Sequence, residues 1–280
     1  MTWLAQLISW LNGGMNVLFR GLRALMQSMP AWLSLTIISA LLGVVLLILF
    51  KYTSPQTAIG RVRDRIKANL LAMKLFKDSV PAVLKAQGKV IAAAFMLLVY
   101  SVPPVLVMML PFCLILGQLG VWYQAAPLEP GNDVEVVMQL SGSVDDPLPQ
   151  VSLVPTDVAQ TIVGPVRVPA EQRIYWKLRT NESGIYNLQF KVGENLVSKQ
   201  LAVGSGLMPV SMKRPSLNVE DVILYPAERP FDESSTVQSI KLSYPDRPGL
   251  LTGSGNWIIT LFVVSMLAAL AVKPVFRVKI

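Results

Sequence analysis

Three long tracts without a charged residue constrain what this chain can fold into. Residues 31–50 hold twenty successive uncharged positions, and residues 90–123 hold another thirty-four. A third tract, at 257–272, is shorter and is followed by three basic residues, Lys273, Arg277 and Lys279. A helix needs about 20 apolar residues to cross the roughly 30 Å of hydrocarbon in a bilayer. The pattern therefore predicts an integral membrane α-helical protein.

The middle tract is too long for one span and too short for two spans joined by a turn. Pro103, Pro104 and Pro111 divide it, and proline ends or kinks a helix. We expect a partly amphipathic helix from Val80 to Ser101 that arrives at the membrane and leads into the second span. The expected transmembrane helices are residues 31–50, 102–123 and 256–273.

The composition supports a membrane location and excludes several kinds of chemistry. Hydrophobic residues make up 52% of the 280 residues and charged residues 15%, against about 25% charged in a typical soluble domain. The absence of histidine excludes histidine-based catalytic triads and histidine metal ligands. The single cysteine, Cys113, excludes an intrachain disulfide and the paired-cysteine motifs of zinc and redox sites.

Charge is segregated along the chain, and this segregation predicts the topology. Between residues 51 and 89 there are nine lysines and arginines and two acids, whereas residues 125–256 hold eleven basic and fifteen acidic residues. Loops rich in lysine and arginine stay in the cytoplasm. We therefore expect residues 51–89 and the tail 274–280 to be cytoplasmic, with the N-terminus and residues 125–256 outside. The expected location is the bacterial inner (cytoplasmic) membrane.

Residues 1–30 are expected to form an amphipathic helix at the membrane interface. Polar or glycine positions recur every three or four residues, so they share one helical face. These positions are Gln6, Ser9, Gly13, Asn16, Arg20, Arg23 and Gln27. A cleaved signal peptide is the alternative, but residues 1–19 lack the early lysine or arginine of such a peptide. We favour a helix that lies along the outer leaflet and turns at Pro30 into the first span.

Residues 51–101 are expected to form a basic cytoplasmic helical hairpin that turns at residues 77–79. Its basic surface consists of Arg61, Arg63, Arg65, Lys67, Lys74 and Lys77. These charges either hold the loop inside and touch anionic membrane lipids, or form a docking surface for an acidic or RNA-rich partner such as a ribosome. Phe76 is the only aromatic residue among them, so we expect no specific nucleic-acid recognition.

Residues 125–204 show the alternating pattern of short antiparallel strands. Strands are expected at residues 134–140, 174–178, 184–190 and 196–203. This pattern predicts an extracytoplasmic antiparallel β-sandwich, immunoglobulin-like in general shape. Residues 205–255 are expected to be a proline-rich extension of this outer domain, with a short helix at 219–225 and a strand at 237–244.

No motif in the sequence indicates an enzyme, so we expect a protein without catalytic activity, cofactor or metal. The chain has no GxSxG motif, no phosphate-binding loop and no GxGxxG motif. Asp145 and Asp146 are adjacent acids, but without further spaced oxygen ligands they are more typical of a solvated turn than of a calcium site. A transporter or channel subunit is disfavoured because none of the three charge-free tracts, residues 31–50, 90–123 and 257–272, contains an acid or a base.

The order of the predicted parts resembles the YidC/Oxa-type membrane insertase superfamily, especially its reduced three-span branch. An outer interfacial helix leads into a span, a basic hairpin and a second span that contains prolines. The similar stretches are Leu18–Leu25, the run Leu46–Phe50 before Lys51, and Pro104 and Pro111 together with Gln118. The resemblance covers residues 1–123 and, loosely, residues 257–280.

This resemblance implies a membrane-protein insertase or a chaperone-like biogenesis factor. In that family, a groove open to cytoplasm and lipid shelters the polar parts of a nascent membrane protein while its apolar segment enters the bilayer. No cofactor is needed. By analogy, the groove candidates are Thr36, Ser39, Tyr100, Ser101, Gln118 and Ser265.

A second hypothesis is a non-catalytic membrane scaffold whose outer β-domain recruits a protein partner in an envelope complex. The two hypotheses differ in where the polar residues of the spans lie. Under the insertase hypothesis, Ser39, Gln118 and Ser265 face one another. Under the scaffold hypothesis, they are scattered or face the lipid.

Overall fold

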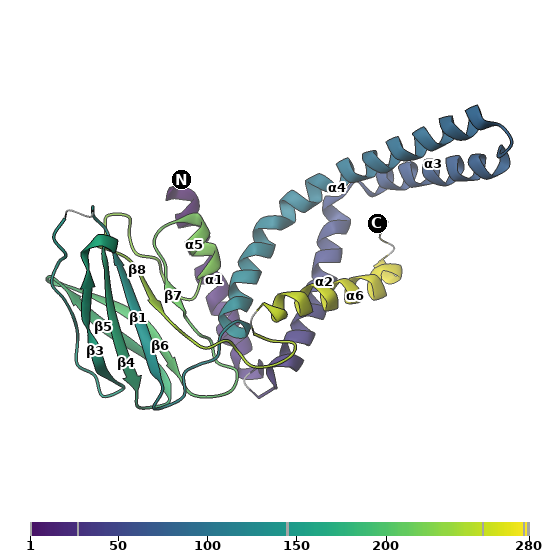
Figure 1. The fold of residues 1–280 in the computed structure, drawn as a ribbon. Helices are drawn as coiled ribbons and strands as arrows, with labels where there is room; N and C mark the ends of the chain where they lie inside the picture. Colours follow the sequence, from purple (N-terminus) through teal and green to yellow (C-terminus); the bar gives the residue numbers. More distant parts are fainter. Residues whose placement is uncertain (1, 27, 144–145, 254, 277, 279–280) are drawn as a thin grey trace. The chain divides into compact units, whose positions relative to one another are not determined.

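The computed structural model of the chain describes residues 2–26, 28–143, 146–253, 255–276 and 278 (Figure 1). The chain divides into two compact units. The first unit combines residues 1–36 with residues 113–260, and the second combines residues 37–112 with residues 261–280. Residues 277, 279 and 280 of the expected cytoplasmic tail lie outside the described residues.

Six α-helices are found in the described part of the chain. They are α1 (Thr2–Met26), α2 (Ala31–Thr53), α3 (Gln56–Leu75), α4 (Val80–Tyr123), α5 (Val219–Leu224) and α6 (Asn256–Phe276). Of these, α2, α4 and α6 are long and apolar enough to cross a membrane. The prediction of three helices of this kind is therefore confirmed.

Helix α4 differs from the prediction because it runs without a break through Pro103, Pro104 and Pro111. The expected division after Ser101 does not end the helix. A proline removes one backbone hydrogen bond but does not prevent the residues on either side from being helical. In an apolar segment the remaining backbone groups are satisfied best within the helix itself, which favours continuation.

The hairpin of α3 and the first part of α4 reverses direction where the sequence predicted (Figure 1). Helix α3 ends at Leu75 and α4 begins at Val80. The Phe76 amide donates to the Ala72 carbonyl at 2.9 Å, and the Ser79 amide donates to the Phe76 carbonyl at 3.0 Å. These bonds close the last turn of α3 and shape the short loop.

The first unit contains an antiparallel β-domain of two sheets. Its strands are β1 (Asp133–Leu140), β2 (Val151–Leu153), β3 (Ala159–Val168), β4 (Arg173–Thr180), β5 (Gly184–Val192), β6 (Asn195–Val203), β7 (Lys213–Arg214) and β8 (Val237–Leu242). One sheet has the strand order β3-β4-β1-β8-β7, and the other has the order β2-β5-β6. The four strands expected between residues 134 and 203 are all present.

Both sheets contribute side chains to one shared core. In β1 the buried positions alternate, so Val134, Val136 and Met138 point inward. Trp176 of the larger sheet contacts Phe190 of the smaller sheet, with ring centroids 5.2 Å apart and planes tilted by 57°. This tilted contact is a favourable arrangement for two aromatic rings and closes the core between the layers.

The proline-rich segment after residue 204 completes the larger sheet. Strand β8 pairs with β1 along Val136–Leu140, and β7 pairs with β8. The sandwich is therefore built from residues on both sides of residue 204, where the sequence placed a domain boundary. The boundary was misplaced because β8 reaches the sheet through a long connection rather than through a hairpin turn.

Candidate functional site

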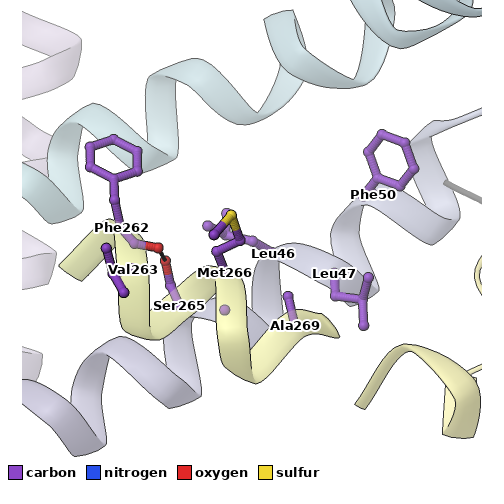
Figure 2. A pocket seen from close by; sticks show the side chains of 9 residues that line it. Leu46, Leu47, Phe50, Phe262, Val263, Ser265, Met266 and Ala269 are labelled. Carbon is purple, nitrogen blue, oxygen red and sulfur yellow. Dashed lines mark hydrogen bonds between the residues drawn. The ribbon is translucent and has the colours of Figure 1, made fainter. Parts of the chain in front are cut away.

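A hollow of about 440 Å³ lies between α2 and α6 in the second unit. Figure 2 shows side chains of both helices around it. Its lining residues are Gly43, Leu46, Leu47, Phe50, Phe262, Val263, Ser265, Met266 and Ala269. Since every lining residue belongs to one of two membrane-type helices, the hollow has the composition of a membrane-embedded site.

Gly43 determines how closely the two helices approach at this hollow. A Cβ atom at Gly43 would lie only 2.1 Å from the backbone oxygen of Ser265, so no larger residue fits without separating the helices. On its other side, α6 contacts α4 through Phe262 and Phe112, whose ring centroids are 5.7 Å apart. Beside this glycine contact, the larger side chains of α2 and α6 do not fill the space between the two helices, and this unfilled space is the hollow.

The hollow is almost entirely apolar. Its one polar side chain is Ser265, whose hydroxyl donates to the Phe262 carbonyl of the same helix at 3.1 Å. The lining contains no carboxylate, amine or thiol, so no lining residue could act as a general base for the Ser265 hydroxyl. The chemistry that fits such a surface is the burial of an apolar segment.

Three of the six groove candidates of the sequence analysis, Thr36, Ser101 and Ser265, bond to their own helices. Thr36 donates to the Trp32 carbonyl at 2.8 Å, and Ser101 donates to the Leu97 carbonyl at 2.9 Å. Ser39 is buried and Tyr100 is partly buried. Serine and threonine often satisfy their hydroxyls in this way inside helices.

Gln118 instead belongs to a polar cluster that joins α1 to α4 and to the segment around α5, all within the first unit. Its amide donates to Asn16 Oδ1 at 2.8 Å, and Asn16 donates to the Pro226 carbonyl at 2.8 Å. One turn earlier on α1, Asn12 donates to the Val222 carbonyl at 2.7 Å. Asn16 was part of the predicted polar face of this helix. Asn12 was missed, although its spacing of four residues from Asn16 places it on that face.

The candidates are therefore distributed between the two units. Thr36 and Gln118 lie in the first unit, and Ser39, Tyr100, Ser101 and Ser265 lie in the second. That Ser39, Gln118 and Ser265 face one another stays a prediction. Within the second unit, Ser265 is the only candidate that lines the hollow.

Compared with known proteins, the chain matches no protein-family model, no curated protein and no solved structure. Its function is therefore inferred from its own geometry.

The basic surface of the hairpin is open to its surroundings. Arg61, Arg65, Lys67, Lys74 and Lys77 are exposed, and Arg63 is partly buried. Among the described residues, no ion pair joins these side chains to a carboxylate. Their charges are therefore available to anionic groups outside the chain.

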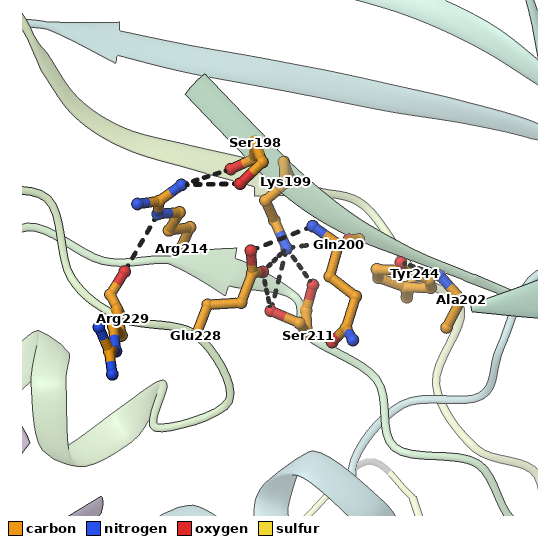
Figure 3. Close-up of polar contacts among 9 residues, drawn as sticks. All are labelled: Ser198, Lys199, Gln200, Ala202, Ser211, Arg214, Glu228, Arg229 and Tyr244. Atoms are coloured by element: carbon orange, nitrogen blue, oxygen red, sulfur yellow. Dashed lines mark hydrogen bonds and ion pairs between the residues drawn. The ribbon is translucent and has the colours of Figure 1, made fainter. Parts of the chain in front are cut away.

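A second polar cluster, in the β-domain, surrounds the buried Lys199 (Figure 3). Its ammonium lies 2.5 Å from Glu228 Oε1, 2.6 Å from the Ser211 carbonyl and 3.0 Å from Ser211 Oγ. Burial lowers the pKa of Lys199, while Glu228 opposes that shift. A serine beside a lysine is a known nucleophile–base pair. Here, however, both side chains are buried, and the ammonium donates to oxygens on every side.

This cluster joins β6, a strand of the smaller sheet, to the loop between β7 and β8. Glu228 accepts hydrogen bonds from the Lys199 ammonium and from the Gln200 amide, both of which belong to β6. Arg214 donates to the Ser198 carbonyl at 2.7 Å. The network therefore holds the loop between β7 and β8 against the sandwich and has a structural role.

Metal ligands are not gathered anywhere in the part of the chain that the structure describes. Of the two adjacent acids considered above, Asp145 lies outside the described residues. Asp146 Oδ2 accepts a hydrogen bond from the Ser143 amide at 2.6 Å, as expected for a turn.

Proposed function

We propose that this chain is a membrane-protein biogenesis factor of the insertase or chaperone-like kind. The apolar hollow between α2 and α6 carries this proposal, because it gives an apolar segment of a nascent membrane protein a place to pack beside Gly43 and Met266. The resemblance to the YidC/Oxa superfamily supports the same function. In this proposal, the client packs into the mainly apolar hollow rather than into the polar groove expected from the sequence.

The proposed topology places α2, α4 and α6 across the bacterial inner membrane. The basic hairpin and the C-terminal tail are cytoplasmic, and the N-terminus and the immunoglobulin-like β-domain are outside. The distribution of lysine and arginine supports this orientation. A client arriving from the ribosome would then meet the hairpin before the membrane helices.

The prolines of α4 supply a means of receiving polar backbone groups. Pro103 and Pro104 have no amide hydrogen, so they cannot donate to the carbonyls of Val99 and Tyr100. At the cytoplasmic edge of the hydrocarbon, a client segment that enters the bilayer has backbone groups that would otherwise stay unsatisfied, at a cost of several kcal/mol each. In the proposed mechanism, these carbonyls accept hydrogen bonds from client groups that have not yet formed their own helix. That exchange lowers the barrier to entry without covalent chemistry.

Photocrosslinking in cells tests the proposal. A photoreactive residue at Leu46 or Met266 lines the hollow, whereas one at Leu41 lies at an exposed position of the same helix α2. Newly made membrane proteins are expected to crosslink from Leu46 and Met266 but weakly from Leu41, and the products should disappear when translation is blocked. Equal crosslinking from all three positions would show that contact is incidental and would contradict the proposal.

A variant that fills the hollow provides a second test. Ala269→Trp places a large side chain in the lining, and Leu41→Trp adds the same bulk outside it. The first substitution is expected to abolish client crosslinking from Leu46, and the second to leave it unchanged.

The scaffold function remains the second candidate, and the edge strand β3 favours it. Ile162, Val163 and Val166 are exposed on this strand, which has only one partner in its sheet. Exposed apolar groups at a sheet edge are typical of a contact surface. A single stable partner crosslinked from Ile162, with no translation-dependent products from the hollow, would establish the scaffold function instead.

A further inference from the structure

The tip of the helical hairpin exposes a group of large apolar side chains. Each is more than half exposed, and together they are Leu71, Leu75, Phe76, Val80 and Leu84. They lie in the last turns of α3, the loop and the first turns of α4. We call these five residues the hairpin tip. The buried residues of α3 lie near its other end, at Ile59, Gly60 and Val62.

Lysines surround the hairpin tip. Lys74, Lys77 and Lys85 are exposed, and Asp78 is the only acid between residues 70 and 89. In the described part of the chain, none of the three lysines forms an ion pair. Apolar side chains flanked by lysine are complementary to an anionic membrane surface, where acyl chains cover the leucines and headgroups bind the ammonium groups.

The length of α4 favours a lipid surface over a soluble partner. Its uncharged tract, residues 90–123, extends about 51 Å as a helix, whereas the hydrocarbon core is about 30 Å thick. Residues 104–123 alone are long enough to cross it. Residues 90–103 are left over, and Ile91 and Phe95 among them are exposed, so this stretch also needs an apolar environment.

Pro103 and Pro104 lie where the spanning part of α4 would meet the remainder. Prolines inside a helix are the usual places for a sharp bend. If residues 90–103 lie along the membrane surface, the hairpin tip is only about 15 Å further along the helix from Val90. The tip is therefore tethered within reach of the leaflet, at a high effective concentration.

We infer that α4 bends at Pro103 and Pro104 in a bilayer and lays its first part on the anionic inner leaflet, with the hairpin tip inserted at the boundary between headgroups and acyl chains. This inference rests on the proposed topology but not on the handling of clients. It assigns the hairpin a lipid partner, phospholipids with anionic headgroups.

Spin-label accessibility in the full chain tests this inference. In a Cys113→Ser background, a nitroxide is attached to a single cysteine at Leu75 or Val80, and the protein is reconstituted into phosphatidylglycerol-rich or purely phosphatidylcholine vesicles. A label at Leu267, an exposed position of α6 outside the hollow, and a label at Glu194 in the exposed β5–β6 turn provide the lipid and water references. Leu75 and Val80 are expected to resemble Leu267 in anionic vesicles and to shift toward Glu194 in neutral vesicles.

Two charge-matched variants separate local contact from total charge. Replacing Lys74, Lys77 and Lys85 with glutamine removes three charges at the tip, and replacing Arg61, Arg63 and Arg65 removes three at the other end of α3. Each lysine near an anionic surface shifts binding about fivefold, so the first variant should lower the ratio of inserted to exposed tip roughly a hundredfold. The arginine variant should change it much less. Circular dichroism checks that both variants remain helical.

Two results would overturn the inference. One is a label at Leu75 that stays accessible to water in both kinds of vesicle. The other is a label that is shielded only when ribosomes are added, which would assign the hairpin tip to a ribosome. Because client crosslinking from Leu46 is measured separately, failure here does not imply failure of the proposed function.

Discussion

Polar side chains do different work in the two units of this protein. In the first unit they join separate elements, as Gln118 does to Asn16 on α1 and as Tyr123 does to Ser34 at 2.9 Å. In the second unit, Ser101 and Ser265 bond to carbonyls of their own helices. The first unit therefore has specific polar links between its parts. Packing in the second unit depends on apolar contact, as between Phe112 and Phe262.

The strongest test of this contrast is Lys199→Met in the outer domain. Removing the ammonium takes the charged donor away from the buried Ser211 carbonyl and from the partly buried Glu228, which keeps the Gln200 amide and the Ser211 hydroxyl as donors. Breaking a buried ion pair by removing one partner costs about 3–5 kcal/mol. Hydrogen exchange of the β6 amides in the full chain should therefore accelerate strongly.

Lys191→Met is the matched control, since Lys191 is an exposed lysine on the neighbouring strand β5. It should leave exchange in β6 unchanged. If Lys199→Met also left exchange in β6 unchanged, the cluster would not be what holds the loop between β7 and β8 against the sandwich.

A smaller effect is expected from Gly43→Ala in the second unit. The added Cβ meets the Ser265 backbone oxygen, so α2 and α6 must separate, and overpacking of this kind costs about 1–3 kcal/mol. Gly88 is a helical glycine of the same unit with open space around its Cβ position. Gly88→Ala should instead stabilise its helix by up to about 1 kcal/mol. Thermal unfolding in nanodiscs should show opposite signs, and equal shifts would refute the close contact.

The attachment of α1 should weaken in Asn16→Ala by a comparable or smaller amount. The substitution leaves the buried Gln118 amide and the Pro226 carbonyl without partners, at a cost of about 1–3 kcal/mol. Limited proteolysis of α1 should then become faster. Gln6→Ala, an exposed position on the same helix, is the control and should cleave at the original rate.

The smallest effect is expected at the exposed ion pairs of Asp133. Hydrogen bonds from Arg179 and Lys177 lower the pKa of Asp133 below its ordinary value of 3.8. Its contribution to stability is therefore complete above that value and is lost as the pH falls through the lower folded pKa. Between pH 7 and pH 3, the free energy of unfolding of the Asp133→Asn variant should decrease slightly less than that of the parent protein. If the variant lost stability in acid as steeply as the parent protein, Asp133 would not contribute to the pH dependence of stability.

The sequence predicted the elements with regular patterns and missed those without one. Alternation predicted strands β1, β4, β5 and β6, and charge-free length predicted the three long helices. Strand β3 escaped because its side chains are nearly all exposed and Pro165 interrupts it. Strand β7 has only two residues, too few to show a period.

Of the six candidate site residues chosen from the sequence, one lines the hollow, and the apolar character of the hollow was not predicted. Polarity alone selected Ser265, which lines the hollow, but also Thr36 and Ser101, whose hydroxyls are satisfied within their own helices. The residue that determines the site is Gly43, and no local pattern distinguishes it from glycines that meet nothing. Close approach between helices that are distant in the sequence becomes visible only in three dimensions.

The position of β8 between β1 and β7 has a consequence for the order of biogenesis. One edge of β1 stays unpaired until residues 237–242 have been synthesised, long after β1 itself has emerged from the ribosome. An open edge of this kind is a site for mispairing with other chains. The β-domain therefore finishes folding only after β8 has been made, shortly before α6 follows along the chain.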